Sequence, residues 1–257
     1  MTVDAPESPQ PTPPGPEGGS TSPWGIRDFR LLWVGRLIAV LAIQIQSSAL
    51  LWQVYTIARR EHPIEQASLY LGLVGLVQFL PLLAFTLPAG EMADRRDRKR
   101  TVAISIAVEG VCALAFLAMA IHGSPPLWAL LAVAAVFGAA RAFLAPASQS
   151  FLPMIVGRAA LPAAIAAQSI AFQVGAIAGP AFGGLIVGIN TPLAYAVSAV
   201  FFAIGLGCMI AIRTSGQPRR PDQAISRLKA VREGLAYVWN TKIVLGAISL
   251  DLVVVML

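Results

Sequence analysis

Long apolar stretches separated by short polar segments run through most of the chain. A helix needs about 20 apolar residues to cross the roughly 30 Å hydrocarbon core of a bilayer. Six stretches are near or above that length, and a seventh reaches 15 residues at the end of the sequence. The stretches cover residues 31–57, 69–89, 101–121, 127–147, 161–189, 193–212 and 243–257. This pattern predicts an all-α integral membrane protein in which a six-span bundle is followed by a seventh span.

Polar segments flank the predicted bundle on both sides. Residues 1–22 are rich in Pro, Ser, Gly and Thr and contain no apolar run, so we expect a disordered cytoplasmic tail. In residues 213–242, apolar side chains recur at helical spacing with basic residues between them, which predicts an amphipathic helix on the cytoplasmic surface. The predicted division is therefore a tail, a six-span bundle over 23–212, a linker, and the start of a second bundle over 243–257.

Composition and charge placement support this topology. Hydrophobic residues make up 56% of the chain, charged residues 12%, and the mean hydropathy is +0.70, above the values of soluble domains. The net charge of +6 could suggest nucleic acid, but 15 of the 19 Lys and Arg residues lie in segments that are cytoplasmic if the N-terminus is inside, against two in external segments. Because positive charge accumulates on the cytoplasmic side, we expect a multi-pass plasma (inner) membrane protein with a cytoplasmic N-terminus and no nucleic-acid partner.

The densest charge cluster lies between the second and third stretches, at residues 90–100. It holds five cations and three carboxylates in eleven residues, so it must form a tight turn in water. A generic positively charged loop would explain the Arg and Lys residues, but not Gly90 and Asp94 at their spacings. The signature residues are Gly90, Asp94, Arg95, Arg98, Lys99 and Arg100.

The pattern Gly-x-x-x-Asp-Arg-x-x-Arg-Lys, which starts at Gly90, closely resembles the loop signature of the major facilitator superfamily of transporters. Asp97 stands where that family usually has glycine, as in the branch that contains the enterobactin exporter and related multidrug exporters. The resemblance implies two six-span bundles with a cytoplasmic latch between them. In that latch Asp94 would lie near the positive N-terminus of a helix from the other half, and Arg95, Arg98 and Lys99 would supply partner charges.

A second motif lies in the fifth stretch, where Gly175, Gly179 and Gly183 recur every four residues. This spacing makes a smooth ridge that another helix can approach closely. Such ridges are common in membrane bundles, but the fuller pattern with Pro180 and Gly184, Gly-x-x-x-Gly-Pro-x-x-Gly-Gly, resembles the fifth-span signature of exporting, antiporter-type members of the same superfamily. The resemblance implies that the ridge lines the interface between the halves, against a helix of the second bundle.

Charged and amide side chains inside the spans are candidates for a substrate or ion cavity, because burying them in hydrocarbon is costly. Arg36 and Gln44 share a face of the first span, although Arg36 lies about 8 Å past its start and could instead snorkel to the surface. Family organisation places the first, fourth and seventh spans on the cavity. The resemblance therefore ranks Arg36, Arg141 and Asp251 above Glu109 of the third span.

Taken together, these features predict a transporter that exports drug- or siderophore-like small molecules across the lipid bilayer by alternating access. Ion-coupled antiport is the expected mode, with protons as the candidate coupling ion. Family members have about twelve spans, so five are missing here. The alternative is a truncated fragment that does not transport, or a half-transporter whose C-terminal half is supplied by another chain.

Enzyme classes find little support in the sequence. His62 and His122 fall in external loops without a nearby cluster of Cys, Asp or Glu, and no HExxH, Gly-x-Ser-x-Gly or phosphate-loop motif occurs. Cys112 and Cys208 are isolated within apolar spans and are expected to pack as small hydrophobic residues. We expect no enzyme activity, no cofactor and no metal.

Overall fold

The computed structural model describes residues 22–123 and 125–217, without the side chains of Glu61 and Asp94. Most of the predicted tail, the amphipathic helix and the seventh span with Asp251 lie outside the described residues. The described chain forms one compact unit of six long helices after a short 3-10 helix. The elements are η1 (Pro23–Gly25), α1 (Arg27–Glu61), α2 (Ile64–Arg95), α3 (Arg98–Ile121), α4 (Leu127–Ile155), α5 (Leu161–Ile189) and α6 (Thr191–Ala211).

The prediction of six spans is confirmed, because each long helix has the length and apolar content to cross a membrane. Several helices are longer than the apolar runs that predicted them. The helix predicted from residue 69 begins at Ile64 and continues through Pro81 to Arg95. Hydropathy marks the part of a helix that suits hydrocarbon, whereas the helix itself ends where its backbone groups find other partners.

The predicted loop at residues 90–100 is much shorter than expected. Helix α2 continues to Arg95 and α3 begins at Arg98, so only two residues between them are non-helical. The Asp97 side chain caps α3 by accepting a hydrogen bond from the backbone N–H of Arg100 at 3.1 Å, a favoured role of aspartate. Charge keeps this segment out of hydrocarbon but does not prevent it from being helical. We call this end of the bundle the signature end.

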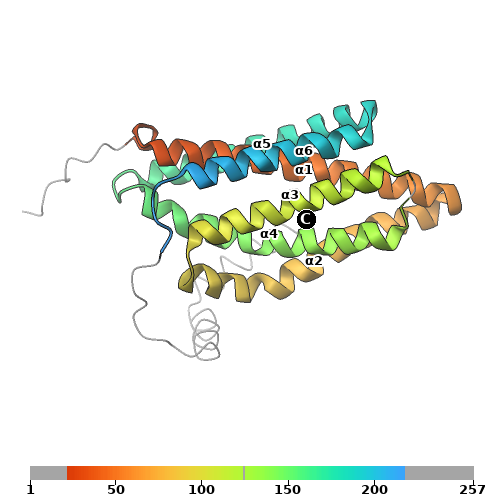
Figure 1. Ribbon diagram of the computed structural model, residues 1–257, viewed down its shortest axis with the longest axis horizontal. Helices are drawn as coiled ribbons and strands as arrows, with labels where there is room; N and C mark the ends of the chain where they lie inside the picture. The colour runs from red at the N-terminus through yellow and green to blue at the C-terminus, as the bar shows by residue number, and fades with distance from the viewer. Residues whose placement is uncertain (1–21, 124, 218–257) are drawn as a thin grey trace, which may run out of the picture. The chain divides into compact units, whose positions relative to one another are not determined.

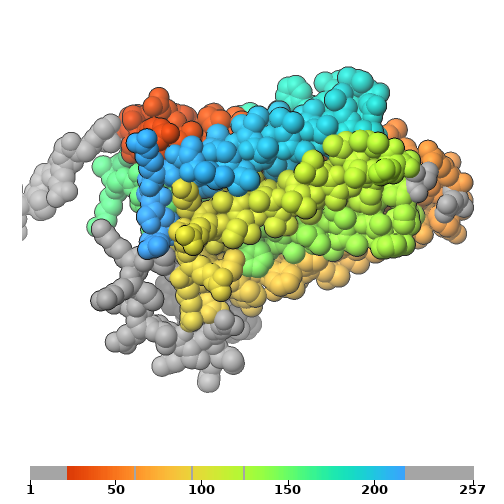
Figure 2. Space-filling view, in the orientation of Figure 1, coloured from red at the N-terminus to blue at the C-terminus, as the bar shows by residue number. Residues whose placement is uncertain are grey.

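The six helices run side by side in two groups of three (Figure 1). Helix α1 packs mainly on α5 and α6, and α4 packs mainly on α2 and α3. Contact between α3 and α6 joins the groups, and Figure 2 shows these two helices side by side along the bundle. The contacts of α1 with α5 and α6 correspond to those of α4 with α2 and α3. The same pattern arises in a bundle built from two three-helix repeats, α1–α3 and α4–α6.

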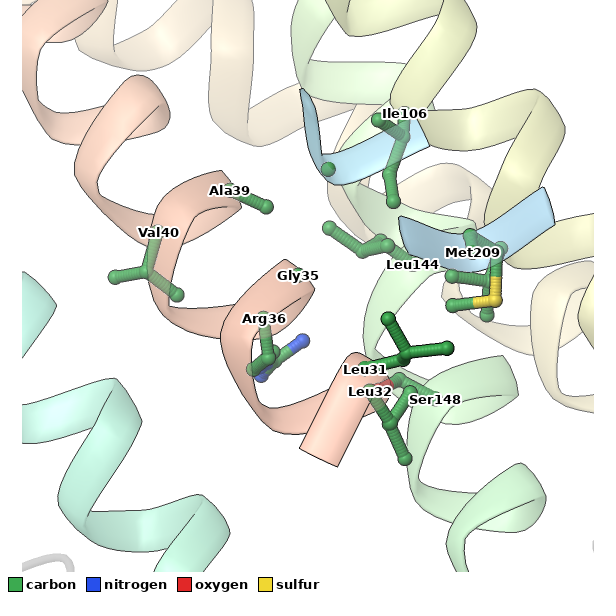
Figure 3. Close-up of a pocket in the computed structure, with 12 residues that line it drawn as sticks. Leu31, Leu32, Gly35, Arg36, Ala39, Val40, Ile106, Leu144, Ser148 and Met209 are labelled. Atoms are coloured by element: carbon green, nitrogen blue, oxygen red, sulfur yellow. The ribbon is translucent and has the colours of Figure 1, made fainter. Parts of the chain in front are cut away.

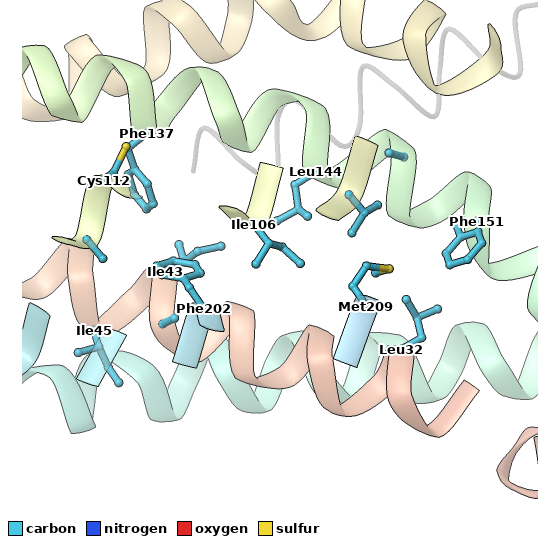
Figure 4. Close-up of a cluster of buried hydrophobic side chains, with 14 of the residues drawn as sticks. Leu32, Ile43, Ile45, Ile106, Cys112, Phe137, Leu144, Phe151, Phe202 and Met209 are labelled. Atoms are coloured by element: carbon cyan, nitrogen blue, oxygen red, sulfur yellow. The ribbon is translucent and has the colours of Figure 1, made fainter. Parts of the chain in front are cut away.

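The interior of the bundle is lined by apolar side chains from both groups. Figure 4 shows Ile43 of α1, Ile106 of α3, Leu144 of α4 and Phe202 of α6 directed into the space between their helices. In the most apolar 18-residue stretch of each helix, 56% is buried inside the bundle for α1 but only 6% for α2. Helix α1 is therefore central, while α2 presents most of its surface to lipid or to another protein surface.

The closest helix approach described here joins α2 and α4 at Gly138. A Cβ atom built on Gly138 would overlap the backbone oxygen and Cα of Gln78, so the two backbones are in contact. Our sequence analysis did not single out Gly138. Its signal was present, because Ala134, Gly138 and Ala142 follow the small-residue spacing that permits close packing.

Candidate functional site

A cavity of about 210 Å³ lies between α1, α4 and α5, with Leu82 of α2 at its edge. Arg36, Gln44 and Arg141 are its polar lining residues, and the others are apolar. We call it the central cavity. The structure thus brings three of the four predicted cavity residues together around one cavity, Arg36 and Gln44 from α1 and Arg141 from α4. The fourth, Asp251, lies outside the described residues.

The central cavity lies halfway along the bundle. Fourteen residues flank Arg141 on each side in α4 (Leu127–Ile155). Seventeen residues flank Gln44 on each side in α1 (Arg27–Glu61). If the helices span the bilayer, these side chains lie near its midplane, which is where transporters of this architecture place their substrate sites.

The two arginines of the central cavity lie beside aromatic rings. The Arg36 Cζ is 5.9 Å from the centroid of the Phe172 ring, and the Arg141 Cζ is 5.8 Å from that of Phe137. Such cation–π contacts offset part of the cost of moving a guanidinium out of water. Among the described residues, neither guanidinium forms an ion pair or donates a hydrogen bond to protein. Both therefore keep their N–H donors for another partner.

A second cavity, of about 760 Å³, adjoins the first on the side of the signature end. The two share Arg36, Ala145 and Phe172. The polar residues of the second cavity are Arg36, Ser148, Gln149, Gln168, Ser169 and Gln173. Our sequence analysis missed the three glutamines of this cavity. Gln168 and Gln173 lie within an apolar stretch, which was an available signal, whereas Gln149 lies just past the stretch predicted at 127–147. No Asp or Glu among the described residues lines either cavity.

Glu109 lies in the interior of the bundle, outside both cavities. Its side chain is fully buried, and neither carboxylate oxygen has a hydrogen-bond partner among the described residues. Arg141 and Arg36 are the charged groups that act on it most strongly. The resemblance ranked Glu109 low because third spans are usually peripheral, but α3 packs on both α4 and α6 here. A buried carboxylate without a partner is far less costly in its protonated form.

A small apolar pocket lies on the other side of α1, between Gly35, Leu144 and Met209 (Figure 3). Its volume is about 20 Å³, which is enough for a single water molecule. Its lining is mostly aliphatic, with Arg36 and Ser148 at its margin. This pocket is too small for a substrate, so the two larger cavities are the candidate site.

The glycine ridge of α5 packs on α1 of the same bundle. A Cβ atom on Gly175 would lie 2.6 Å from Cγ1 of Val40, and one on Gly183 would lie 2.8 Å from Oγ of Ser48. The expectation that the ridge faces a helix of the second bundle is therefore wrong. Small residues at this spacing specify that some helix approaches closely, but not which helix it is.

Gly179, in the middle of the ridge, positions a cavity residue. A Cβ atom there would overlap Cβ of Gln44, so the close packing fixes the height of Gln44 in the cavity wall. Pro180 and Gly184 belong to the same motif but are exposed. A Cβ atom on Gly184 would meet nothing within 4 Å.

Two cations of the charged signature bind carbonyl groups near helix ends. The Arg98 Nε donates to the Ala93 carbonyl of α2 at 2.9 Å, and its Nη1 donates to the Ser150 carbonyl of α4 at 3.3 Å. The Lys99 Nζ donates to the Ile212 carbonyl after α6 at 2.6 Å. The Ala93 carbonyl lies in the last turn of α2 and the Ile212 carbonyl follows α6, where carbonyl groups lack helical partners and the helix dipole favours cations. The Ser150 carbonyl lies within α4. Arg98 and Lys99 were expected to supply charges to the second bundle; here they tie together three helices of their own bundle.

The other signature residues make weaker contacts or none. Arg95 pairs with Glu91 at 3.3 Å, and the exposed Arg100 pairs with Asp97 at 3.8 Å. A Cβ atom on Gly90 would meet nothing within 4 Å, so packing among the described residues does not require this glycine. Asp94 lies in the last turn of α2, and the latch role of its side chain stays a prediction.

We expect Arg98→Met to destabilise the bundle by about 1.5 kcal/mol, the low end of the range for hydrogen bonds from charged donors, because Arg98 is half-exposed. Arg100→Met should cost well below about 1 kcal/mol, since its ion pair is exposed. Thermal unfolding of the chain in detergent would measure both. Equal effects of the two substitutions would contradict the bridging role of Arg98.

Comparison with known proteins identifies the family to which this fold and site belong. The sequence model described as "Major Facilitator Superfamily" matches residues 32–257. The chain belongs to the Major Facilitator Superfamily, as its two motifs predicted.

This chain covers less than half of the curated relatives that it matches. The multidrug efflux pump Tap of Mycolicibacterium fortuitum is 32% identical over 197 residues, which cover 71% of this chain and 46% of the pump. The staphyloferrin A transporter of Staphylococcus aureus is 26% identical over 145 residues, which cover 54% of this chain and 36% of that protein. The chain spans about half the length of the efflux pumps it matches.

A crystal structure of a POT family transporter in complex with 5-aminolevulinic acid has the same fold. Its TM-score is 0.60 at 13% sequence identity, with 89% of this chain and 46% of that chain covered. At this identity the likeness concerns the fold alone. The six-helix bundle described here therefore corresponds to one half of a larger transporter architecture.

Proposed function

We propose that this chain is the first bundle of an exporter of small molecules that works by alternating access. The observation that carries the proposal is the central cavity of a membrane-length bundle, which Arg36, Gln44 and Arg141 line together, with Gln44 and Arg141 at mid-height of their helices. The relatives named as a multidrug efflux pump and as a staphyloferrin A transporter support a drug- or siderophore-like substrate. We place the protein in the plasma membrane with a cytoplasmic N-terminus, from its charge distribution.

The second bundle of this proposal closes the cavities from the open side. Phe172 and Gln173 of α5 and Gln149 of α4 line the second cavity and are exposed in the single bundle. A facing bundle would cover them and form the other half of the binding site. At the signature end, the same bundle would approach Gly90, where the structure leaves room for it, and Asp94 would hold the latch.

Protons are the coupling ion that we propose for antiport. Two intramembrane carboxylates are available to carry them, Glu109 in the bundle interior and Asp251 in the predicted seventh span. Glu109→Gln and Asp251→Asn keep the size of each side chain and remove its titration. Loss of the dependence of export on a pH gradient in one of the two variants would identify the carrier. Unchanged dependence in both would rule out these carriers.

A second candidate function is a half-transporter that works as a self-assembled pair. It is favoured by the share of the relatives that the chain spans, about half of their length. In such a pair the open faces of two identical bundles would close a common cavity.

We expect the 257-residue chain alone to insert into liposomes but not to catalyse flux of drugs or siderophores, because its cavities lack an opposing wall. Co-reconstitution with a second bundle should restore flux driven by an ion gradient. Protein-free liposomes and liposomes with the second bundle alone are the controls. Gradient-driven flux by the chain alone would favour the self-assembled pair, and absence of flux in every assembly would overturn the exporter proposal.

A further inference from the structure

The two cavities carry positive charge only. Arg36 lines both of them and Arg141 lines the central cavity, while no described carboxylate lines either wall. Guanidinium groups stay protonated at any physiological pH. The described half of the candidate site therefore holds two positive charges, one from Arg141 at mid-height of α4 and one from Arg36 in the first third of α1.

These charges are not neutralised within the described bundle. Neither guanidinium forms an ion pair or donates a hydrogen bond among the described residues. Each contacts one aromatic ring, which leaves its N–H donors unused. A guanidinium presents these donors in a planar fork that matches the two oxygens of a carboxylate.

Carboxylates elsewhere in the chain do not make the lining of the cavities negative. Glu109 lines neither cavity, is fully buried and has no hydrogen-bond partner among the described residues, although Arg141 and Arg36 act on it electrostatically. Asp251, which the sequence predicts on the cavity, would contribute one negative charge against two positive charges. Cys112 and Tyr195, the other buried titratable groups on α3 and α6, are neutral in their ordinary forms.

We propose that the central cavity binds small anionic solutes that carry carboxylate groups, with Arg36 and Arg141 as the anion-binding residues. The inference rests on the proposed function, since it assigns a substrate class to the same site. Gln44, which lines the same cavity, supplies an amide that can donate to a further oxygen. Organic cations are disfavoured in this cavity, because both arginines repel them.

An anionic substrate also fits the direction of transport. The electrical potential across a plasma membrane is negative inside, so it drives an anion outward without any further ion. A cation exported through the same site would move against both the potential and the arginine charges. The positive charge of the cavity and the outward direction of transport therefore both favour an anionic substrate.

The test is equilibrium binding to the purified 257-residue chain in nanodiscs, followed by calorimetry or by tryptophan fluorescence. Citrate is the carboxylate, inorganic phosphate is a second oxyanion, and tetraphenylphosphonium is the organic cation. We expect citrate to bind at least tenfold more tightly than tetraphenylphosphonium. Tighter binding of phosphate than of citrate would overturn the carboxylate preference. Tighter binding of tetraphenylphosphonium would overturn the proposal, as would absence of citrate binding.

Substitutions then locate the site. Arg36→Gln and Arg141→Gln, which keep an amide donor but remove the charge, should each raise the citrate Kd at least tenfold. The matched control is Arg158→Gln, because Arg158 is exposed between α4 and α5 and should leave the Kd unchanged. Arg141→Lys keeps the charge if Arg141→Gln fails to fold, and its Kd should lie between those of the wild type and Arg36→Gln. Equal citrate affinity in all folded variants would overturn the assignment of these arginines.

Failure of this inference is distinguishable from failure of the proposed function. Flux of the same compounds is measured after co-reconstitution with a second bundle. Citrate binding without any flux would defeat the exporter proposal and support the anion site. Export of tetraphenylphosphonium without citrate binding would support the exporter and overturn the anion site.

Discussion

Gly179→Leu should destabilise the bundle by about 3 kcal/mol or more, whereas Gly184→Leu, five residues further along α5, should be close to neutral. The backbone of α5 touches α1 at Gly179, where even a Cβ atom would overlap Cβ of Gln44. A leucine there must push the two helices apart, and overpacking of this kind costs about 1–3 kcal/mol and occasionally more. At Gly184 a Cβ atom meets nothing within 4 Å, and leucine suits both a helix and a lipid-facing surface.

The measurement is thermal or denaturant-induced unfolding of the purified chain in detergent, with yield in the membrane as a second readout. The two variants add the same side chain to the same helix, so the difference between them reports packing on α1. Citrate binding should also weaken in Gly179→Leu, because displacement of α1 moves Gln44. Comparable stabilities of the two variants would show that α5 does not pack on α1 through this ridge.

Gly138→Ala should destabilise the bundle by about 1 kcal/mol, although alanine is the better helix former. The added methyl group would overlap backbone atoms of Gln78 on α2. Backbone cannot rotate away as a flexible side chain can, so α2 and α4 must separate, at a typical overpacking cost of about 1–3 kcal/mol. The gain in helix propensity, about 1 kcal/mol, offsets part of this cost.

The matched control is Gly75→Ala in α2, where a Cβ atom meets nothing within 4 Å. Only the propensity term acts there, so stability should rise by up to about 1 kcal/mol. Unfolding of both variants in the same detergent separates the two effects. A stabilised Gly138→Ala variant would contradict the close approach of α2 and α4.

Part of the candidate site could be predicted because its residues are polar and the stretches around them are apolar. Arg36, Gln44 and Arg141 are polar groups in apolar stretches, and hydrocarbon tolerates such groups only where they face an interior or a cavity. The same reasoning should have included Gln168 and Gln173, which line the second cavity. Gln149 also lines it, but lies in the part of α4 beyond the predicted stretch. Glu109 was ranked low by family organisation, yet the packing of α3 between α4 and α6 buries it completely.

The sequence by itself determined the six membrane-length helices of the described residues and the family. Apolar length and motif spacing are properties of a single segment and its neighbours. Tertiary structure alone decided which surfaces meet. The Gly175–Gly183 ridge specifies a close approach but not its partner, and it faces α1 rather than a second bundle. Likewise, the charges of Arg98 and Lys99 keep the signature end in water, but only the packed bundle brings carbonyl groups of α2, of α4 and of the residue after α6 within their reach. Contacts between segments far apart in sequence depend on how all six helices pack together, and no single segment encodes that packing.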